Sequence, residues 1–284
     1  MNINYLKEGM EKSAISCGIR LSPEEELIVK NSLILLQNDN KFHNIFFWGR
    51  INAIENDYYI AYGYTKDCLA ERKFFYSVNG FRWIMLPSPV KENISASILC
   101  PDMFIGDPTA MANVVMDPEF TIDDNQVILA TPPQTIRLKE EDRLSSIVHI
   151  ITEESALIPR GALYKLTDMN VIYNPEFRGL NELDSTELIN YQLYRNPHNE
   201  YNYNLLKRSD YNLTTDFLDT IDDIVPENNA FAVNLSHDET FVSIKSLVWP
   251  GMFFFHKLHS KKHGFVYFGN GKKNFDLLFM LNKY

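Results

Sequence analysis

Cysteine is scarce in this sequence, with three residues among 284. Cys17, Cys68 and Cys100 are widely spaced and odd in number, so they predict neither a disulfide framework nor a zinc site. A chain without such pairs is typical of a reducing compartment, and we expect a cytoplasmic location. No apolar stretch reaches the roughly 18 residues of a membrane-spanning helix, and Lys7 and Glu8 interrupt the first apolar run. Neither a spanning helix nor a signal peptide is therefore expected.

Positive charge is also in deficit. The chain has 27 Lys and Arg residues against 37 Asp and Glu residues, a formal net charge of -10 and a pI of about 5.2. This balance is unfavourable for binding nucleic acid or an anionic membrane, because both depend on a positive protein surface. The 45% hydrophobic and 13% aromatic content is typical of a folded chain. We predict a single unit over 1–284, with a possible subdivision into 1–135 and 136–284.

Two segments have the apolar periodicity of helices. The first covers 22–37 and begins with a capping box, in which Ser22 and Glu25 satisfy free backbone donors of the first turn. Its apolar stripe is broader than one buried face needs, so we expect this helix to be sandwiched between other elements. The second covers 138–153 and has apolar residues at spacings of three and four on one face, which we expect to lie in the core.

Short aromatic and β-branched runs separated by turn residues predict two antiparallel meanders. The first covers 44–86 and the second 230–281, whose last strand is expected over Phe275–Leu281. Between the first meander and the second helix, 87–133 is rich in proline and has no long pattern, which favours either an interaction loop or partial disorder. The predicted fold class is α+β, with mainly antiparallel β-meanders and packed helices.

One predicted strand is apolar on both faces. In Met252–Phe255 every residue is apolar, so both faces must be covered, either by helices of the same chain or by another chain. The pattern does not choose between these alternatives. As a hypothesis, four residues of this strand and the last run contact a partner: Phe253, Phe255, Phe275 and Leu277. Phe255→Asp would then abolish partner binding and leave the isolated fold intact.

A cluster of basic residues follows this strand. It consists of His256, Lys257, His259, Lys261, Lys262 and His263. The lysines would repel a divalent cation, and no metal-binding pattern is present, so we predict a solvated basic loop that suits an acidic partner surface. A metalloenzyme that uses the three histidines remains an alternative. Gly269–Lys273 fails the Walker spacing and predicts a hairpin turn. The residues therefore predict no catalytic, metal or cofactor-binding site, and no cofactor.

Several sequence strings resemble the radial spoke head protein 9 family, in the order typical of that family. Two examples are Phe-Trp-Gly-Arg-Ile at Phe47–Ile51 and Ile-Pro-Arg-Gly-Ala-Leu-Tyr-Lys at Ile158–Lys165. The others are Asp57–Gly63, Arg72–Ser77, Phe104–Pro108, Ser246–Gly251 and Gly264–Leu281. The resemblance extends over nearly the whole chain. It is weakest in 1–20, 107–133 and 196–239.

The resemblance implies a non-enzymatic structural subunit of the radial spoke head in the axoneme of motile cilia and flagella. It also implies binding to related spoke head proteins of the 4/6 type and transient contact of the head with projections of the central pair. Such spokes relay mechanical signals that help to regulate dynein on the doublets. A freely soluble intracellular adaptor is the main alternative, because it would present the same surface features.

Overall fold

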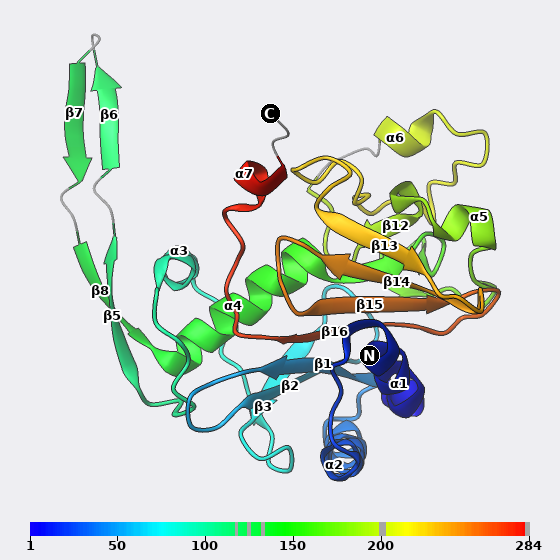
Figure 1. The fold of residues 1–284 in the computed structure, drawn as a ribbon, viewed down its shortest axis with the longest axis horizontal. Coiled ribbons are helices and arrows are strands. Elements are labelled where there is room, and N and C mark those ends of the chain that lie inside the picture. The colour runs from blue at the N-terminus through cyan, green and yellow to red at the C-terminus, as the bar shows by residue number, and fades with distance from the viewer. Residues whose placement is uncertain (117–118, 124–125, 132–133, 199–202, 282–284) are drawn as a thin grey trace.

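The computed structural model describes residues 1–116, 119–123, 126–131, 134–198 and 203–281. An eight-stranded sheet crosses the molecule in the order β13-β14-β15-β16-β1-β2-β3-β4 (Figure 1). Its strands are β1 (Asn44–Ile51), β2 (Tyr58–Tyr64), β3 (Lys73–Ser77), β4 (Ile84–Met85), β13 (Phe231–Leu235), β14 (Phe241–Ser246), β15 (Met252–Lys257) and β16 (His263–Gly269). The α+β class is confirmed, and so are the two meanders, apart from the last predicted strand.

The two meanders join in one sheet through a parallel contact between β1 and β16. Gly49 pairs with Tyr267 at the start of this contact, and the other strand pairs of the sheet are antiparallel. Gly49 has a positive φ of 148°, and a Cβ there would lie 2.1 Å from the carbonyl oxygen of Tyr267. Glycine therefore allows the two halves of the chain to approach at this point.

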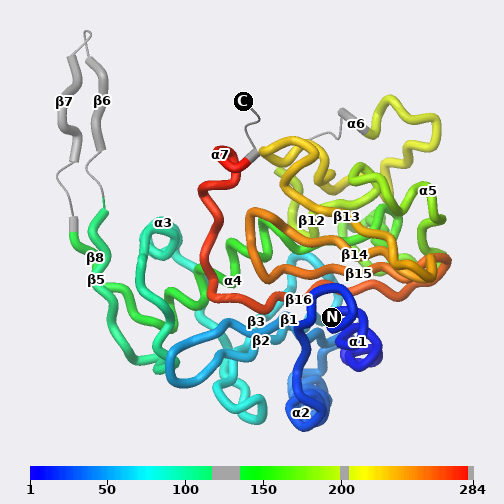
Figure 2. Tube along the Cα trace, viewed as in Figure 1, coloured from blue at the N-terminus to red at the C-terminus, as the bar shows by residue number. Residues whose placement is uncertain are grey.

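Helices cover both faces of the sheet, as the blue and green segments of Figure 2 show. On one face, α1 (Leu6–Cys17) and α2 (Pro23–Asn40) pack on β-strand residues such as Phe47 and Phe253. On the other face, α4 (Glu140–Ser155) packs on a second core cluster that includes Trp48. The predicted core face of α4 is confirmed, since its four regularly spaced apolar residues are buried: Leu144, Ile147, Val148 and Ile151.

The expected sandwiching of α2 is wrong, although its capping box is confirmed. The Ser22 side chain accepts from Glu25 N, and the Glu25 carboxylate accepts from Ser22 N. One face of the helix, with Val29 and Leu33, is buried against the sheet. Four apolar residues on the outward side are exposed: Leu27, Ile28, Ile34 and Leu35. The reason is that α2 is the outermost element on this side of the sheet (Figure 1).

The segment 87–133 has more regular structure than the sequence predicted. It contains α3 (Lys91–Leu99) and β5 (Met111–Met116), and β5 pairs with β8 (Gln134–Lys139). A second pair follows, β6 (Glu119–Asp123) with β7 (Gln126–Thr131). A small core of Ala96, Cys100, Val114 and Leu138 holds α3 against the β5-β8 ribbon. Residues 117–118, 124–125 and 132–133 of the predicted excursion lie outside the described residues.

The remaining helices and strands are short. They lie at the two ends of the described chain and in the segment between α4 and β13. They are η1 (Ile3–Tyr5), β9 (Leu157–Pro159), β10 (Leu163–Lys165), β11 (Val171–Tyr173), α5 (Glu182–Ser185), η2 (Leu188–Asn190), β12 (Tyr191–Leu193), α6 (Tyr203–Leu206) and α7 (Leu277–Leu281). In this fold β9 pairs with β12 and β10 with β11. None of the described helices is long and apolar enough to span a membrane.

The predicted last strand over Phe275–Leu281 is wrong. After β16 the chain leaves the sheet, runs past α4 and ends in α7 (Figure 1). The physical reason is that β16 already pairs with β15 on one side and β1 on the other. No edge of β16 is left for another hairpin strand, so the glycine-rich segment before α7 is not the predicted hairpin turn.

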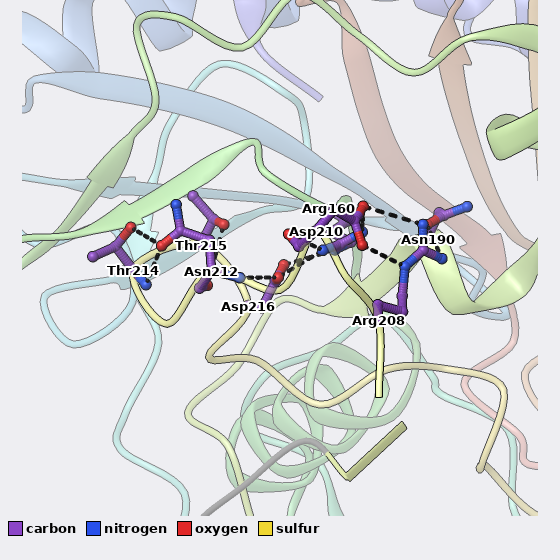
Figure 3. A network of polar contacts seen from close by, with 8 residues as sticks. All are labelled: Arg160, Asn190, Arg208, Asp210, Asn212, Thr214, Thr215 and Asp216. Carbon is purple, nitrogen blue, oxygen red and sulfur yellow. Dashed lines mark hydrogen bonds and ion pairs between the residues drawn. The ribbon is translucent and has the colours of Figure 1, made fainter. Parts of the chain in front are cut away.

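A polar network fixes the segment between α6 and β13 to the turn after β9 (Figure 3). The guanidinium of Arg160 donates to both carboxylate oxygens of Asp216 at 2.7 Å and to Asp210 at 2.8 Å. Asp216 is buried, whereas the Asp210 side chain is 54% exposed. Hydrogen bonds from Arg208 and Arg160 lower the pKa of Asp210 well below its usual range.

We expect Asp216→Asn to destabilise the protein by about 3 kcal/mol, because it leaves the charge of Arg160 poorly compensated in a buried site. Asp210→Asn is the matched control and should cost less than about 1 kcal/mol, since an exposed ion pair contributes little. Urea unfolding of the two variants measures the difference. Equal losses would contradict the assignment of Asp216 as the anchor of this network.

Candidate protein-interaction surface

The structure places two of the predicted partner residues in the core. Phe253 is 2% exposed and Phe255 is not exposed at all. Both lie under α1, where a Cβ on Gly9 would come within 2.9 Å of the Phe255 ring. Phe254 faces the opposite side, with its ring 5.8 Å from that of Tyr191. Elements of the same chain therefore cover both faces of β15, which is the first of the two alternatives that the sequence left open.

The other two predicted partner residues lie at the end of the chain. Phe275 is 58% exposed, and Leu277 is 6% exposed. The residues that follow Leu277 are also exposed and apolar. Leu278 is 51%, Phe279 77% and Met280 69% exposed. We name Phe275, Leu278, Phe279 and Met280 the C-terminal surface. A run of this kind is costly to leave in water and is typical of a site that a partner covers.

A groove of about 550 Å³ lies beside this surface, over the outward side of α4. Its apolar lining comes from several elements: Ile94, Ile98, Ile150, Leu193, Ile224, Val225, Phe231 and Val248. Lys273 connects the groove to the C-terminal surface, because its Nζ donates to Glu154 at 2.8 Å. Asn274 fixes the same segment by donating from its backbone to Val248 and from its side chain to Leu247. The groove lining therefore reaches Lys273, which lies two residues before Phe275, the first residue of the C-terminal surface.

Charged and polar side chains surround the apolar lining of the groove. They are His149, Glu153, Glu154, Arg195, His198 and Lys273. Three of them are held by ion pairs: Arg195 pairs with Asp219 at 3.0 Å, and Lys273 pairs with Glu154 at 2.8 Å. An apolar centre with a polar rim is the usual anatomy of a protein interface, in which exposed aromatic residues contribute much of the binding energy.

A second exposed apolar patch lies on α2, which is on the opposite side of the sheet from α4 (Figure 1). We name Leu27, Ile28, Ile34, Leu35 and Phe81 the α2 surface. The loop that carries Phe81 is held against the helix, because the Ser32 hydroxyl donates to the carbonyl of Gly80 at 2.7 Å. None of the residues of the α2 surface lines the α4 groove.

The predicted basic loop is used within the chain. Lys262 forms a 2.6 Å ion pair with Glu8 of α1, and Lys257 lies 3.4 Å from the same carboxylate. These contacts lower the pKa of Glu8, and the hydrogen bond from Lys262 makes the largest contribution. Lys261 donates to the carbonyl of Pro175 at 2.8 Å. The loop therefore contacts α1 and the segment after β11, and its positive charge is partly compensated.

The three clustered histidines do not converge on one point. His256 is buried and its Nε2 accepts from Leu180 N at 3.0 Å, whereas His263 lies beside Lys261 O and His259 is exposed in a loop. Burial lowers the pKa of His256 to about 3 and that of His263 to about 4, so both are neutral at pH 7. Within the described part of the chain, no group of three or more His, Cys, Asp or Glu residues is placed to hold a metal ion.

We expect His256 to make stability depend on pH. Its pKa is depressed in the folded state, so the unfolded chain binds more protons and stability falls as the pH drops below about 6.5. Between pH 7 and pH 5 the loss from this residue is on the order of 2 kcal/mol. His256→Gln keeps an acceptor for Leu180 N but has no group that titrates in this range. Between pH 7 and pH 5 this variant should therefore lose about 2 kcal/mol less stability than the unchanged chain. Urea unfolding at the two pH values tests this, and parallel losses would contradict it.

Sequence reasoning placed a partner contact in the run Phe275–Leu281 but named only Phe275 and Leu277 within it, and not Phe279 and Met280, which dominate the C-terminal surface by exposure. Every residue in Leu277–Leu281 is apolar, so neither the strand nor the helix period separates a buried from an exposed face. It also missed the exposure of α2. Asn31 and Asn38, which interrupt the apolar stripe on the outward side, are the residues that could have indicated it.

Comparison with known proteins gives the family. No protein-family model matches the chain. The chain is 34% identical to the human radial spoke head protein 9 homolog over 273 residues, with 94% of this chain and 96% of the relative covered. It is 35% identical to the mouse homolog over 274 residues, with the same coverage. The homolog of Xenopus tropicalis is 30% identical over 265 residues, with 93% of this chain and 94% of the relative covered.

These matches first define the class, which is a structural protein of the ciliary axoneme. Within that class, the chain belongs to the radial spoke head protein 9 family. The resemblance of the sequence strings is thereby confirmed over nearly the full length of the chain.

Proposed function

We propose that the chain is a structural subunit of the axonemal radial spoke head, where it binds related spoke head proteins of the 4/6 type. Family membership supports the place in the spoke head. The observation that carries the binding role is the C-terminal surface, whose residues Phe275 and Phe279 are 58% and 77% exposed beside an apolar groove. Partner side chains that fill the groove would bury both the groove lining and this surface.

The fold suits a part that transmits force between the central pair and the dynein-bearing doublets. One sheet connects the first and last parts of the chain, and helices are packed on both of its faces. Close-packed layers of this kind deform little and pass strain from one surface to another. The subunit would therefore act through its rigidity and its contacts, with transient contact of the assembled head with central-pair projections.

Retention on the axoneme tests this function. The tagged chain is expressed in a ciliated cell, isolated cilia are stripped with detergent, and the axonemes are washed with graded salt. We expect the chain to remain through moderate salt and to leave together with 4/6-type spoke head proteins. Release with the soluble matrix would contradict the structural role and favour a soluble adaptor.

A further inference from the structure

A second cavity, separate from the α4 groove, lies where two central strands diverge and is partly open to solvent. It has a volume of about 250 Å³. Its position follows from the sheet, because β1 and β16 pair only from Gly49 and Tyr267 onward. Before that point Met1 lies between the strands, and its amino group donates to Phe47 O at 2.6 Å and to Phe265 O at 2.8 Å. The cavity occupies the space on the α4 side of this gap, where Thr152 contributes to its wall.

Aromatic rings with nearly parallel faces form one wall of the cavity. The rings of Phe46 and Tyr62 are 5.0 Å apart with an interplanar angle of 7°, and Phe46 and Tyr173 are 6.1 Å apart at 17°. Trp48, Phe177, Tyr194 and Phe265 complete the aromatic lining. A flat ligand can extend such a stack, because offset rings attract one another beyond the area that they bury. A cavity of about 150 Å³ holds benzene, so this one has room for two fused rings.

The charged groups of the lining are all cations or potential cations. They are Arg72 and Lys261, whereas His263 is neutral at pH 7, and no Asp or Glu lines the cavity. Arg72 donates to Leu69 O and Tyr194 O, and no carboxylate of a described residue lies within ion-pair distance of it. An aromatic pocket can attract cations, but these side chains would repel them. The charge of the site therefore favours an anion.

One hydroxyl of the lining has no hydrogen-bond partner among the described residues. Tyr62 lines the cavity and is 5% exposed, yet its hydroxyl makes no hydrogen bond to any described residue. The hydroxyl is therefore free to donate to an acceptor that enters the cavity. Burial raises the pKa of Tyr62, which keeps the hydroxyl protonated and able to donate at neutral pH.

We infer that this cavity binds a small planar organic acid, with its ring system against the stacked aromatic wall and its carboxylate near Tyr62 and Arg72. The stacked rings favour a flat ring system. The absence of Asp and Glu from the lining favours a negatively charged group on the ligand. This binding is independent of the proposed partner contact, since the cavity and the C-terminal surface share no residue.

Titration of the full chain with 2-naphthoate by calorimetry tests the inference. We expect saturable binding of one molecule per chain. The neutral isostere 2-naphthamide should bind at least about tenfold more weakly, because it lacks the negative carboxylate that would form an ion pair with Arg72. Octanoate, which has the carboxylate without a flat body, should also bind more weakly. Absence of saturable binding to the folded chain, or equal binding of the amide or of octanoate, would overturn the proposal.

Substitutions locate the binding in this cavity. Tyr62→Phe removes the unpaired hydroxyl without changing the ring, and it should weaken 2-naphthoate binding about tenfold. Arg72→Gln should weaken it by a similar factor or more. Tyr59→Phe is the matched control, because Tyr59 lies on the same strand but donates to Glu25 outside the cavity. If Tyr62→Phe and Tyr59→Phe bound the probe as tightly as the unchanged chain, the assignment to this cavity would be wrong.

Discussion

Phe255→Asp should prevent the chain from folding, rather than detach a folded chain from its partner. The side chain has no exposed surface, and it packs between β15 and α1. The change removes a buried aromatic ring, which costs about 3–5 kcal/mol, and it adds a carboxylate that has no partner in an apolar site. The sum exceeds about 5 kcal/mol, which is comparable to the whole stability of many domains.

Near-ultraviolet circular dichroism of the purified protein measures this effect, with Phe255→Leu as the matched control. Leucine keeps the site apolar, so that variant should retain the native spectrum and lose only about 1–3 kcal/mol of stability. The outcome that the sequence hypothesis predicted was the reverse, a folded Phe255→Asp protein that no longer binds its partner. That outcome would show that β15 is covered by another chain and not by α1.

Phe279→Asp should abolish partner binding and leave the fold intact. The ring is 77% exposed, so its loss leaves no internal cavity, and the melting temperature should change little. In a complex the new carboxylate would be buried against apolar groups, and removal of an aromatic hot spot weakens binding by about 30-fold or more. Capture of a co-expressed 4/6-type spoke head protein measures the effect.

Phe81→Asp is the control for this experiment, because it makes the same substitution at a residue that is 61% exposed on the α2 surface. We expect that variant to capture the partner as the unchanged chain does. The opposite result, with loss of capture in Phe81→Asp alone, would assign the interface to the α2 surface. The comparison therefore separates the two exposed patches of the molecule.

The sequence predicted elements whose period is set by one buried face. The alternation in β13 was sufficient, because burial in that strand follows the same period. In α4 the spacing correctly predicted the buried residues Leu144, Ile147 and Ile151, although other sides of this helix are buried as well. The capping box of α2 was predictable for a local reason, since Ser22 and Glu25 are near neighbours in the chain. These features need no knowledge of distant contacts.

The sequence could not predict which apolar residues face solvent. Phe255 and Phe279 are both phenylalanines in apolar runs, and they differ only in what the rest of the chain places over them. The strand predicted at Phe275 failed for a similar reason, because only the topology shows that both edges of β16 are occupied. The family could be recognised from the sequence. The segments that resemble it include residues of core strands such as β1 and β16. The exposure of Phe279 and Met280 required the structure.

We propose that the C-terminal surface holds the chain in the spoke head. The most direct measurement compares Phe279→Asp with Phe81→Asp in ciliated cells that lack the unchanged chain. Axonemes are stripped with detergent, and the fraction of each tagged variant that remains at moderate salt is determined. Our account predicts that Phe81→Asp remains bound together with 4/6-type proteins, whereas Phe279→Asp is folded but appears in the detergent extract. Equal retention of the two variants would contradict it.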